Sequence, residues 1–362
     1  GLTSGSKWSL LPWGQYLIAT NNLDPLQLWL GTGLASSISD GPSSCPIICP
    51  LNVFVLALNV EGEDGRVEFS DAGDPTVWTP TLENLAGGFN IRDVSSPLSS
   101  GVPFGDQVLA QTQNQAYLIY YVGGDTVITY RSLGVSVGAA GKNCVVVVAG
   151  VAYGLDRGGF WASDGLQESR ISQPQIWDYL KDRIDFSLGD QIYAYHNKAR
   201  STIEWHYFTT SGTQEGIAFS LDNKGWAPRS YGLSAVSGEG TFSNPICAQG
   251  TDLRTMNSGV DAGTAALSSF VQTKPLAMGQ TDFWKLLGEI RLRKSGSGLL
   301  AVGLHESPDD EPDWQSAETL SERHFPARDS VFFSLKFSSE DAGADWSVAA
   351  MQFYGNIGGN RL

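Results

Sequence analysis

Short apolar segments recur through the first two thirds of the sequence, and turn-forming residues separate them. The segments are Tyr16–Ala19, Val53–Leu58, Gln107–Ala110, Cys144–Ala149, Gln191–Tyr195 and Ile246–Ala248. They stand roughly 40 to 55 residues apart, which is the length of one four-stranded blade in proteins built from radially arranged sheets. The sequences between the segments differ, so the repeat is one of structure. The spacing predicts an all-β chain with a β-propeller of five or six blades.

The stretch from residue 191 to 226 shows how one interval is organised. Strand-forming residues fill Gln191–His196, Thr202–Phe208 and Glu215–Leu221, and short turns separate the three runs. Asp222–Gly225 then turns the chain into Trp226. This alternation of strands and tight turns is an antiparallel meander, which is the topology of a propeller blade.

The pattern changes after about residue 235. The run Leu286–Lys294 alternates between apolar and polar residues, with Leu286 on the apolar face, and Val331–Phe337 alternates again. Such strands predict a small antiparallel sandwich. We therefore expect a β-propeller over residues 1–240 and, over residues 241–362, a C-terminal β-strand region that packs on the propeller or closes it.

Composition argues against long helices. The chain has 42 glycines, and only 17% of its residues are charged, whereas long helices usually carry many charged side chains on their outer faces. One short helix is predicted after Pro174, where apolar residues recur at helical spacing from Ile176 to Ile184. We expect the helix content to stay below about 10%.

The net charge is −15, from 23 basic and 38 acidic side chains. Affinity for phosphates comes mostly from Lys and Arg, so this surface is not expected to bind duplex DNA. An acidic surface favours solubility first. It also suits a channel through which DNA slides without binding.

Cysteine usage and hydropathy bear on the compartment. No apolar run approaches the ~20 residues that a membrane-spanning helix needs, and residues 1–30 lack the ordered parts of a secretory leader. The C-x₃-C of Cys45 and Cys49 has no second pair and no nearby histidine, which argues against zinc. With Cys144 and Cys247, we expect reduced, half-buried cysteines, as in a protein assembled in the cytoplasm.

Two segments carry turn motifs. In Ser70–Trp78, the aspartates can accept hydrogen bonds from local backbone N–H groups and the tryptophan can anchor the loop. Tyr153–Trp161 has a D-x-G-x-x-W spacing, similar to the Asp-box turn of sialidases, which belongs to the fold and lies far from catalysis. We therefore expect structural turn roles for Ser70, Asp71, Gly73, Asp74, Pro75, Trp78, Asp156, Gly158 and Trp161.

Motifs for catalysis or cofactors are absent from the sequence. It contains no G-x-S-x-G, no H-E-x-x-H and no phosphate-binding loop. The acidic run Asp309–Asp313 lacks the ordered spacing of a calcium loop, so a solvated loop is expected. We expect no catalytic residue, no bound metal and no cofactor. Surface or rim positions are expected for the four histidines, His196, His206, His305 and His324.

Several runs resemble the tail propeller proteins of bacteriophages. The clearest is Arg66–Trp78, in which S-D-x-G-D-P-x-x-W follows a hairpin. The runs Thr129–Val137, Cys144–Val148 and Phe160–Gly165 follow in similar order and spacing. The run Trp284–Arg293 is similar to the terminal sheet of the same proteins. These motifs are structural, so the resemblance speaks to the fold more than to a site.

The resemblance implies a structural virion protein. The family includes tail hub and nozzle proteins of short-tailed phages, also described as packaged-DNA-stabilising proteins. Membership implies a homo-hexameric ring below the portal and adaptor proteins, with a tail fibre or plug protein as a further partner. Double-stranded DNA would be retained and then conducted through the lumen without specific binding. The expected location is the virion tail, after assembly in the host cytoplasm, and no enzymatic activity is implied.

One alternative belongs to another class. Propellers also serve as carbohydrate-binding proteins or as sialidase-like glycoside-processing enzymes. That function requires clustered arginines and a pair of carboxylates at the mouth of the propeller. The sequence offers arginines, but none of them stands near a recognisable acid pair. A shared fold does not decide between the two functions.

Overall fold

The structure is a computed structural model of the 362-residue chain. It describes residues 8–92, 94–134, 136–229, 233, 235–237, 244–249, 252–256, 269–279, 281, 283–339 and 346–360. Of the described residues, 52% lie in strands and 7% in helices, so the protein is all-β. The chain divides into two compact units, Gly1–Met256 and Asn257–Leu362. The boundary predicted between residues 240 and 241 lies outside the described residues.

The first unit holds five four-stranded antiparallel sheets in chain order, which we call blades 1 to 5. Blade 1 comprises β1 (Ser9–Trp13), β2 (Tyr16–Thr20), β3 (Gln27–Trp29) and β4 (Ser36–Ser37); blade 2 comprises β5 (Ile47–Leu51), β6 (Phe54–Leu58), β7 (Arg66–Phe69) and β8 (Gly87–Asn90); blade 3 comprises β9 (Ser100–Phe104), β10 (Gln107–Gln111), β11 (Ala116–Tyr121) and β12 (Ile128–Ser132). Blade 4 comprises β13 (Val145–Val148), β14 (Val151–Asp156), β15 (Gly159–Ser163) and β16 (Glu168–Arg170); blade 5 comprises β17 (Tyr193–Asn197), β18 (Thr202–Phe208), β19 (Gln214–Ser220) and β20 (Trp226–Arg229). A three-stranded sheet follows, with β21 (Ala235–Ser237), β22 (Ile246–Gln249) and β23 (Asp252–Thr255).

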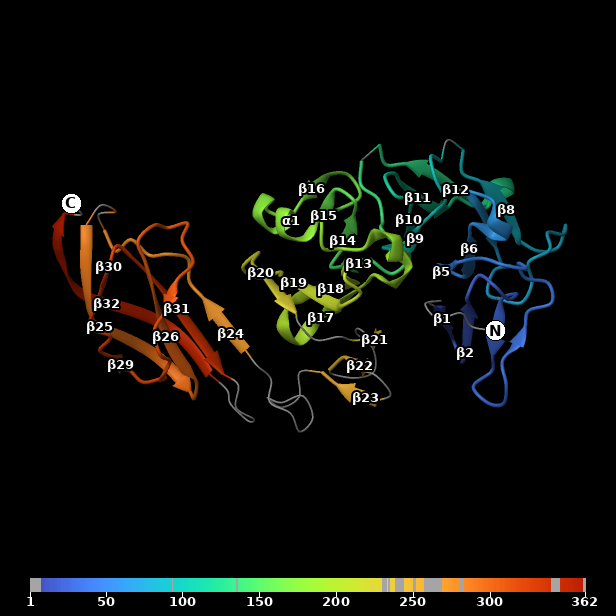
Figure 1. Ribbon diagram of the computed structural model, residues 1–362. Helices are drawn as coiled ribbons and strands as arrows, with labels where there is room; N and C mark the ends of the chain where they lie inside the picture. Colours follow the sequence, from blue (N-terminus) through green and yellow to red (C-terminus); the bar gives the residue numbers. More distant parts are fainter. Residues whose placement is uncertain are drawn as a thin grey trace. The chain divides into compact units, whose positions relative to one another are not determined.

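The blades follow one another around the unit (Figure 1). The first strand of each blade contacts the first strand of the next, from β1 through β5, β9 and β13 to β17. Apolar side chains fill the spaces between facing sheets: one cluster joins blades 1 and 2, a second joins blades 2 and 3, and a third joins blades 3, 4 and 5. This radial stacking of four-stranded meanders is a β-propeller architecture, which confirms the predicted fold class.

The recurrent apolar segments do not all occupy the same place in a blade. Three of them coincide with second strands, β2, β6 and β10, whereas Cys144–Ala149 and Gln191–Tyr195 fall mainly on first strands, β13 and β17. Both strand positions are buried on two faces between neighbouring blades, so both read as apolar runs. The spacing of the apolar segments therefore indicates the number of blades. It does not indicate which strand of a blade each segment forms.

The one α-helix in the described residues is α1 (Pro174–Leu180), after blade 4. Trp177 of α1 packs edge-on against Phe160, with ring centroids 6.3 Å apart, so the helix covers the side of a blade. Ile184, which the periodicity placed on the same helix, is buried beyond its end. The 3₁₀ segments are η1 (Val60–Gly62), η2 (Gly124–Thr126), η3 (Phe186–Gln191) and η4 (Lys198–Arg200), of which η3 is kinked at Leu188. None of the helices in the described residues is long enough to span a bilayer.

The second unit is a two-sheet antiparallel sandwich. Its strands are β24 (Ser269–Gln272), β25 (Phe283–Gly296), β26 (Leu299–His305), β27 (Asp313–Trp314), β28 (Glu318–Thr319), β29 (Arg323–His324), β30 (Arg328–Ser330), β31 (Phe332–Ser339) and β32 (Trp346–Asn360). One sheet has the order β24-β31-β26-β27, with β28 also on β26; in the other, β25 pairs with β29 and β30 along one edge and with β32 along the other. Leu287, Ile290, Val302, Phe333 and Leu335 meet in a shared core.

One face assignment in this unit was wrong. Leu286, predicted to face the core, is 44% exposed, and its neighbour Leu287 is 1% exposed. The cause is a register shift between Leu287 and Glu289 where β25 pairs with β32. A bulge adds one residue to one strand and so exchanges the two faces of the sheet.

Candidate binding grooves

The turn Ser70–Trp78 links β7 to the loop before β8, and its aspartates accept hydrogen bonds from the backbone. Asp71 Oδ1 accepts from the N–H of Leu85 at 2.7 Å. Asp74 Oδ1 accepts from the N–H of Thr76 at 2.9 Å. Both carboxylates are therefore engaged with the loop itself.

Trp78 and Ser70 of this turn are held inside the fold. Trp78 is 5% exposed, and its Nε1–H donates to the carbonyl oxygen of Pro75 at 2.8 Å. Gly73 has φ of 80°, a conformation that a residue with a Cβ adopts only with strain. Ser70 is fully buried. Trp78 and Ser70 are thus packed inside the fold, whereas Asp74 is exposed and Asp71 is half-buried.

Sequence reasoning missed Asp40, which anchors the same turn from blade 1. Its carboxylate accepts from the backbone N–H groups of Trp78 and Thr79, at 2.7 and 2.9 Å, and from the Thr79 hydroxyl. Hydrogen bonds from Thr79 lower the pKa of Asp40 below its usual value, since they favour the charged form. Asp40 lies 38 residues from Trp78 in the sequence, so no local motif pointed to it.

The second turn motif centres on Asp156, which is 3% exposed. Its carboxylate accepts from the N–H groups of Gly158 at 2.7 Å and Gly138 at 3.2 Å, and forms an ion pair with Arg170 at 2.5 Å. Trp161 is fully buried and donates from Nε1 to the carbonyl oxygen of Gly138 at 2.9 Å. Asp156 thus joins the β14–β15 turn to the segment before blade 4.

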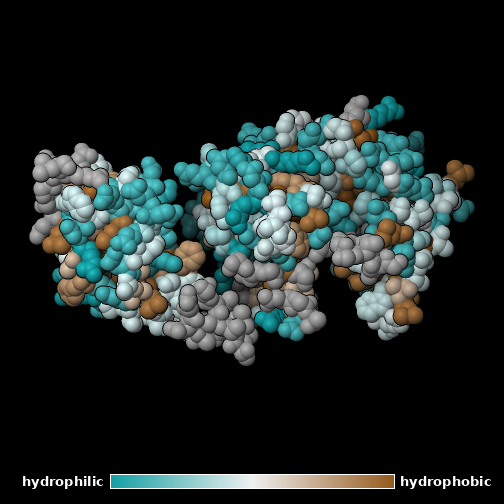
Figure 2. Space-filling view, viewed as in Figure 1, coloured by the Kyte–Doolittle hydropathy of each residue, from teal (hydrophilic) through white to brown (hydrophobic). Residues whose placement is uncertain are grey.

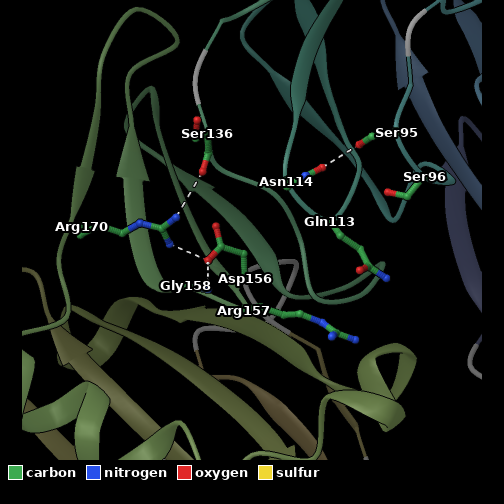
Figure 3. Close-up of a pocket in the computed structure, with 9 residues that line it drawn as sticks. All are labelled: Ser95, Ser96, Gln113, Asn114, Ser136, Asp156, Arg157, Gly158 and Arg170. Carbon is green, nitrogen blue, oxygen red and sulfur yellow. Dashed lines mark hydrogen bonds and ion pairs between the residues drawn. The ribbon is translucent and has the colours of Figure 1, made fainter.

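An open groove lies beside this turn (Figure 3). We call it the Arg157 groove; its volume is about 350 Å³, and it is lined by Ser95, Ser96, Gln113, Asn114, Ser136, Asp156, Arg157, Gly158 and Arg170. The lining comes from the turns β10–β11 and β14–β15, from the segments that connect blades 2 to 3 and 3 to 4, and from the last residue of β16, Arg170. Nearly every lining side chain is polar.

The charges of the Arg157 groove limit its chemistry. Asp156 is the single carboxylate in the lining, and Arg170 neutralises it. Arg157 forms no ion pair within the described residues, and its side chain extends away from the Asp156–Arg170 pair (Figure 3). Hydrolysis of a glycoside needs two carboxylates on opposite sides of the bond. The lining of this groove supplies one carboxylate, which is paired with Arg170.

A second groove lies on blade 1, and the sequence analysis did not identify it. We call it the indole groove; its volume is about 570 Å³, and it is lined by Trp8, Leu10, Leu17, Ala19, Asp24, Pro25, Gln27, Trp29, Ala35 and Ser37. Leu10 and Leu17 alternate along their strands with Leu11 and Ile18, which pack against blade 2. The groove is therefore the opposite face of blade 1. Trp29 is 39% exposed there.

A buried polar cluster lies in blade 5. The Glu204 carboxylate is fully buried; it accepts from Tyr195 Oη at 2.8 Å, Asn197 Nδ2 at 3.1 Å and Thr202 Oγ1 at 3.1 Å. Arg229 Nε lies 3.5 Å from the same carboxylate. The cluster satisfies a buried charge, which would otherwise destabilise the native state.

His206 lies beside this cluster. Its ring stacks on Tyr193 and Tyr195, with centroid distances of 5.1 and 5.8 Å. Burial lowers the pKa of His206 to about 4, against the opposing effect of Glu204.

The prediction of surface or rim histidines was wrong for three of the four. His206 is fully buried, and His305 and His324 are 4% and 3% exposed. Polar residues on one face of β18 suggested a solvated face. Tyr193 and Tyr195, which stack on His206, pack against Leu233 and Cys247, so residues that follow blade 5 in the chain cover that face.

Metal-ligand chemistry finds no support in the described residues, where no cluster of three His, Cys, Asp or Glu side chains could hold an ion. The acidic run Asp309–Asp313 forms a local turn. Asp310 Oδ2 accepts from the N–H of Ser307 at 2.9 Å, and Asp313 Oδ2 accepts from Gln315 Nε2 at 3.1 Å.

The four cysteines are free thiols and all are buried, more deeply than the half-buried state expected. Burial raises the pKa of Cys45 and Cys49 to about 12 and that of Cys144 to about 11. A thiol reacts as its thiolate, so the raised pKa values disfavour reaction of these side chains at neutral pH.

Comparisons with known proteins add little beyond these observations. No protein-family model matches the sequence, and no curated protein matches it. Among solved structures, the chain is similar to a protein of Bacteroides uniformis provisionally assigned as a 6-phosphogluconolactonase, with 10% identity over 70% of this chain and 81% of the other, at a TM-score of 0.44. It is also similar to the SapL1 lectin in complex with α-methyl fucoside (12% identity, 70% and 92% coverage, TM-score 0.38) and to the WD40 domain of SCAP from fission yeast (9% identity, 92% and 94% coverage, TM-score 0.35).

Proposed function

We propose that this chain is a structural protein of a phage tail, a hub or nozzle without enzymatic activity. The observation that carries the proposal is how the polar residues of the resembling runs are used. Asp71, Asp74 and Asp156 all accept backbone hydrogen bonds within turns. Trp78 and Trp161 are buried anchors. These contacts support a structural role for the residues that carry the resemblance, as expected of a tail component.

The proposed assembly is a homo-hexameric ring below the portal and adaptor, with a fibre or plug protein beyond it. Head-to-tail contacts between unlike surfaces close into a ring when the rotation per subunit matches. The surface seen in Figure 2 is mostly hydrophilic, with small separate hydrophobic patches. Leu34, Leu82, Leu166 and Leu253 are at least 78% exposed.

Electron microscopy of the purified chain tests the assembly. We expect rings of uniform size, alone or after addition of the portal and adaptor proteins of the same virus. A chain that stays monomeric with those proteins and fails to join their complex would contradict the proposal.

DNA binding gives an independent test. The net charge of −15 predicts no appreciable affinity for duplex DNA at low salt, where any basic lining would bind most tightly. An assembled ring should carry more acidic than basic side chains along its lumen; the turn Glu61–Asp64 and the loop Asp309–Asp313 are candidates. Tight, salt-sensitive DNA binding would contradict the conducting role.

A second candidate function is carbohydrate binding, and the indole groove favours it. Trp8 and Trp29 line the groove together, and Asp24 and Gln27 add polar groups beside them. Aromatic faces stack on the apolar faces of pyranose rings, and a few polar side chains fix the orientation. Gln27 Nε2 already donates to Ser37 Oγ at 2.9 Å, so a sugar would have to compete for it.

Tryptophan fluorescence on titration with a panel of pyranosides tests this second function. Binding predicts a saturable change that Trp29→Ala abolishes, while Trp314→Ala, in the other unit, leaves it intact. The absence of any change across the panel would leave only the structural function. Turnover of a fluorogenic glycoside, lost on substitution of a carboxylate, would contradict the proposal that the chain is not an enzyme.

A further inference from the structure

The last strand of the sandwich has an open edge. β32 pairs with β25 along one side, and no described strand pairs with its other side. The fifteen residues of β32 include no charged residue and no proline. In the sequence, the nearest charges, Asp345 and Arg361, flank the strand. Natural proteins usually protect a long edge with charges, proline or irregularity, because its free N–H and C=O groups attract another strand.

Only one segment of β32 has a regular edge that could pair with a further strand. Pairing with β25 is regular from Ala350 to Tyr354 and shifts between Val348 and Ala350. Met351 and Tyr354 are 38% and 41% exposed. The regular segment has five residues, close to the usual length of a strand, and Gln352 is at its centre.

The opposite edges of the sandwich are protected. On that side the strands are two or three residues long and carry Asp313, Glu318, Arg323 and Arg328. His324 Nδ1 lies 3.2 Å from Glu318 Oε2, which joins β29 to β28 across the two sheets. Short charged strands that are tied to each other do not accept a further strand.

The unprotected edges lie together on the other side. Trp346 Nε1, at the start of β32, donates to Ser269 Oγ, at the start of β24, at 3.0 Å. β24 is also an edge strand without charge, and its Phe270 and Val271 are 61% and 57% exposed. The edge strands β32 and β24 thus carry no charged residue, although Lys336 and Arg291 of the adjacent strands lie over the Phe270 and Tyr354 rings, whereas the edge strands on the other side are charged.

We infer that the open edge of β32 pairs antiparallel with β32 of a second copy of this chain, about a two-fold axis at Gln352. A second copy is the fitting occupant because two uncharged edges satisfy each other, whereas the charged edges of the same sandwich exclude a strand. Antiparallel pairing places Ala350 opposite Tyr354, and Gln352 opposite the same residue of the second copy. The same surface of each copy meets across the two-fold axis, so the contact uses up both surfaces and the assembly stops at a dimer.

This contact is separate from the ring of the proposed function. A ring joins unlike surfaces of successive copies, whereas pairing through β32 joins identical surfaces. A protein that dimerises through β32 without forming rings would support the inference and not the proposed function. Rings that form without the β32 contact would support the proposed function and not the inference.

Two variants of Gln352 test the inference by sedimentation. Gln352→Lys and Gln352→Glu each place like charges opposite each other across the two-fold axis, so each variant alone should lose the dimer. Mixed together, they should restore a heterodimer, because opposite charges then meet. Thr319→Lys adds the same charge to the protected edge and should leave the dimer intact.

The melting temperature of each variant shows that the fold is retained. A wild-type chain without self-association through the sandwich, or Gln352 variants that dimerise as well as the wild type, would overturn the inference. Loss of the dimer in both variants without restoration in the mixture would overturn the two-fold register. Restoration by mixing is an outcome that a merely destabilised sandwich would not give.

Discussion

Arg170 Nη1 lies 2.5 Å from Oδ1 of Asp156, and the two residues close the β14–β15 turn at the edge of the Arg157 groove. The carboxylate is buried, and the guanidinium side chain is 39% exposed. Arg170 also donates to the carbonyl oxygens of Gly159 and Ser136, each at 3.2 Å. The ion pair thus ties the turn to the segment between blades 3 and 4.

Asp156→Asn should destabilise the propeller unit by about 2 kcal/mol, because it removes the charge from a buried acceptor. Loss of a fully buried pair costs about 3–5 kcal/mol, and the exposure of Arg170 reduces this through screening by solvent. Urea unfolding measures the change. Asp164→Asn is the matched control, since Asp164 accepts similar backbone bonds on the surface and should matter less. Equal effects of the two variants would contradict a structural role for Asp156.

Trp78→Ala should destabilise by roughly 3–5 kcal/mol, as expected for truncation of a large buried aromatic residue. The side chain packs in the cluster between blades 1 and 2 and donates to Pro75. Thermal unfolding followed by circular dichroism measures the change. Asp71→Asn, which keeps one oxygen for the Leu85 N–H, should have a smaller effect. If Asp71→Asn left the melting temperature unchanged but abolished an activity, the turn would be a functional site.

Stability should fall as the pH drops from about 6.5 to about 4, in part through His206. Its pKa in the native state is about 4, and the unfolded value is about 6.5. Over this window the unfolded chain binds a proton that the native state excludes, so the full contribution is present above pH 6.5. At about pH 4 the free energy of unfolding has lost about 3 kcal/mol through His206.

The comparison that isolates this effect is urea unfolding of the wild type and of His206→Gln at pH 7 and pH 4.5. The variant should lose less stability between the two pH values, although it starts from a lower value. Glu204 and Arg229 face the imidazole and remain in both proteins. Identical pH dependence would show that His206 does not titrate in this range.

The native protein should react with a thiol reagent such as DTNB only slowly at pH 8, and all four cysteines should react after unfolding in guanidinium. Burial raises the pKa of Cys45, Cys49, Cys144 and Cys247, so the thiolate is scarce. Rapid modification of Cys45 or Cys49 in the native state would contradict the packing of blade 2.

Local patterns predicted the meanders well. In blade 5 the predicted strands Gln191–His196, Thr202–Phe208 and Glu215–Leu221 lie within two residues of β17, β18 and β19. Strand period and turn residues act over a few positions, so they can be read from neighbouring letters. The hydrogen bond from Thr76 to Asp74 has the same short range.

What the sequence by itself determined was therefore the strands, the turns between them and their grouping into blades, because each depends on residues close in the chain. The tertiary structure decided which faces are covered. The alternating pattern predicted that Glu204 and His206 face solvent. Both are fully buried, because further parts of the fold cover the second side of β18. Leu286 and Leu287 exchanged sides through a bulge set by the distant strand β32. The Asp40 carboxylate, between blades 1 and 2, accepts a hydrogen bond from the N–H of Trp78 in blade 2. Trp8 and Trp29 line the same groove on one face of blade 1. Such contacts depend on residues far apart in the sequence, which only the packed sheets bring together.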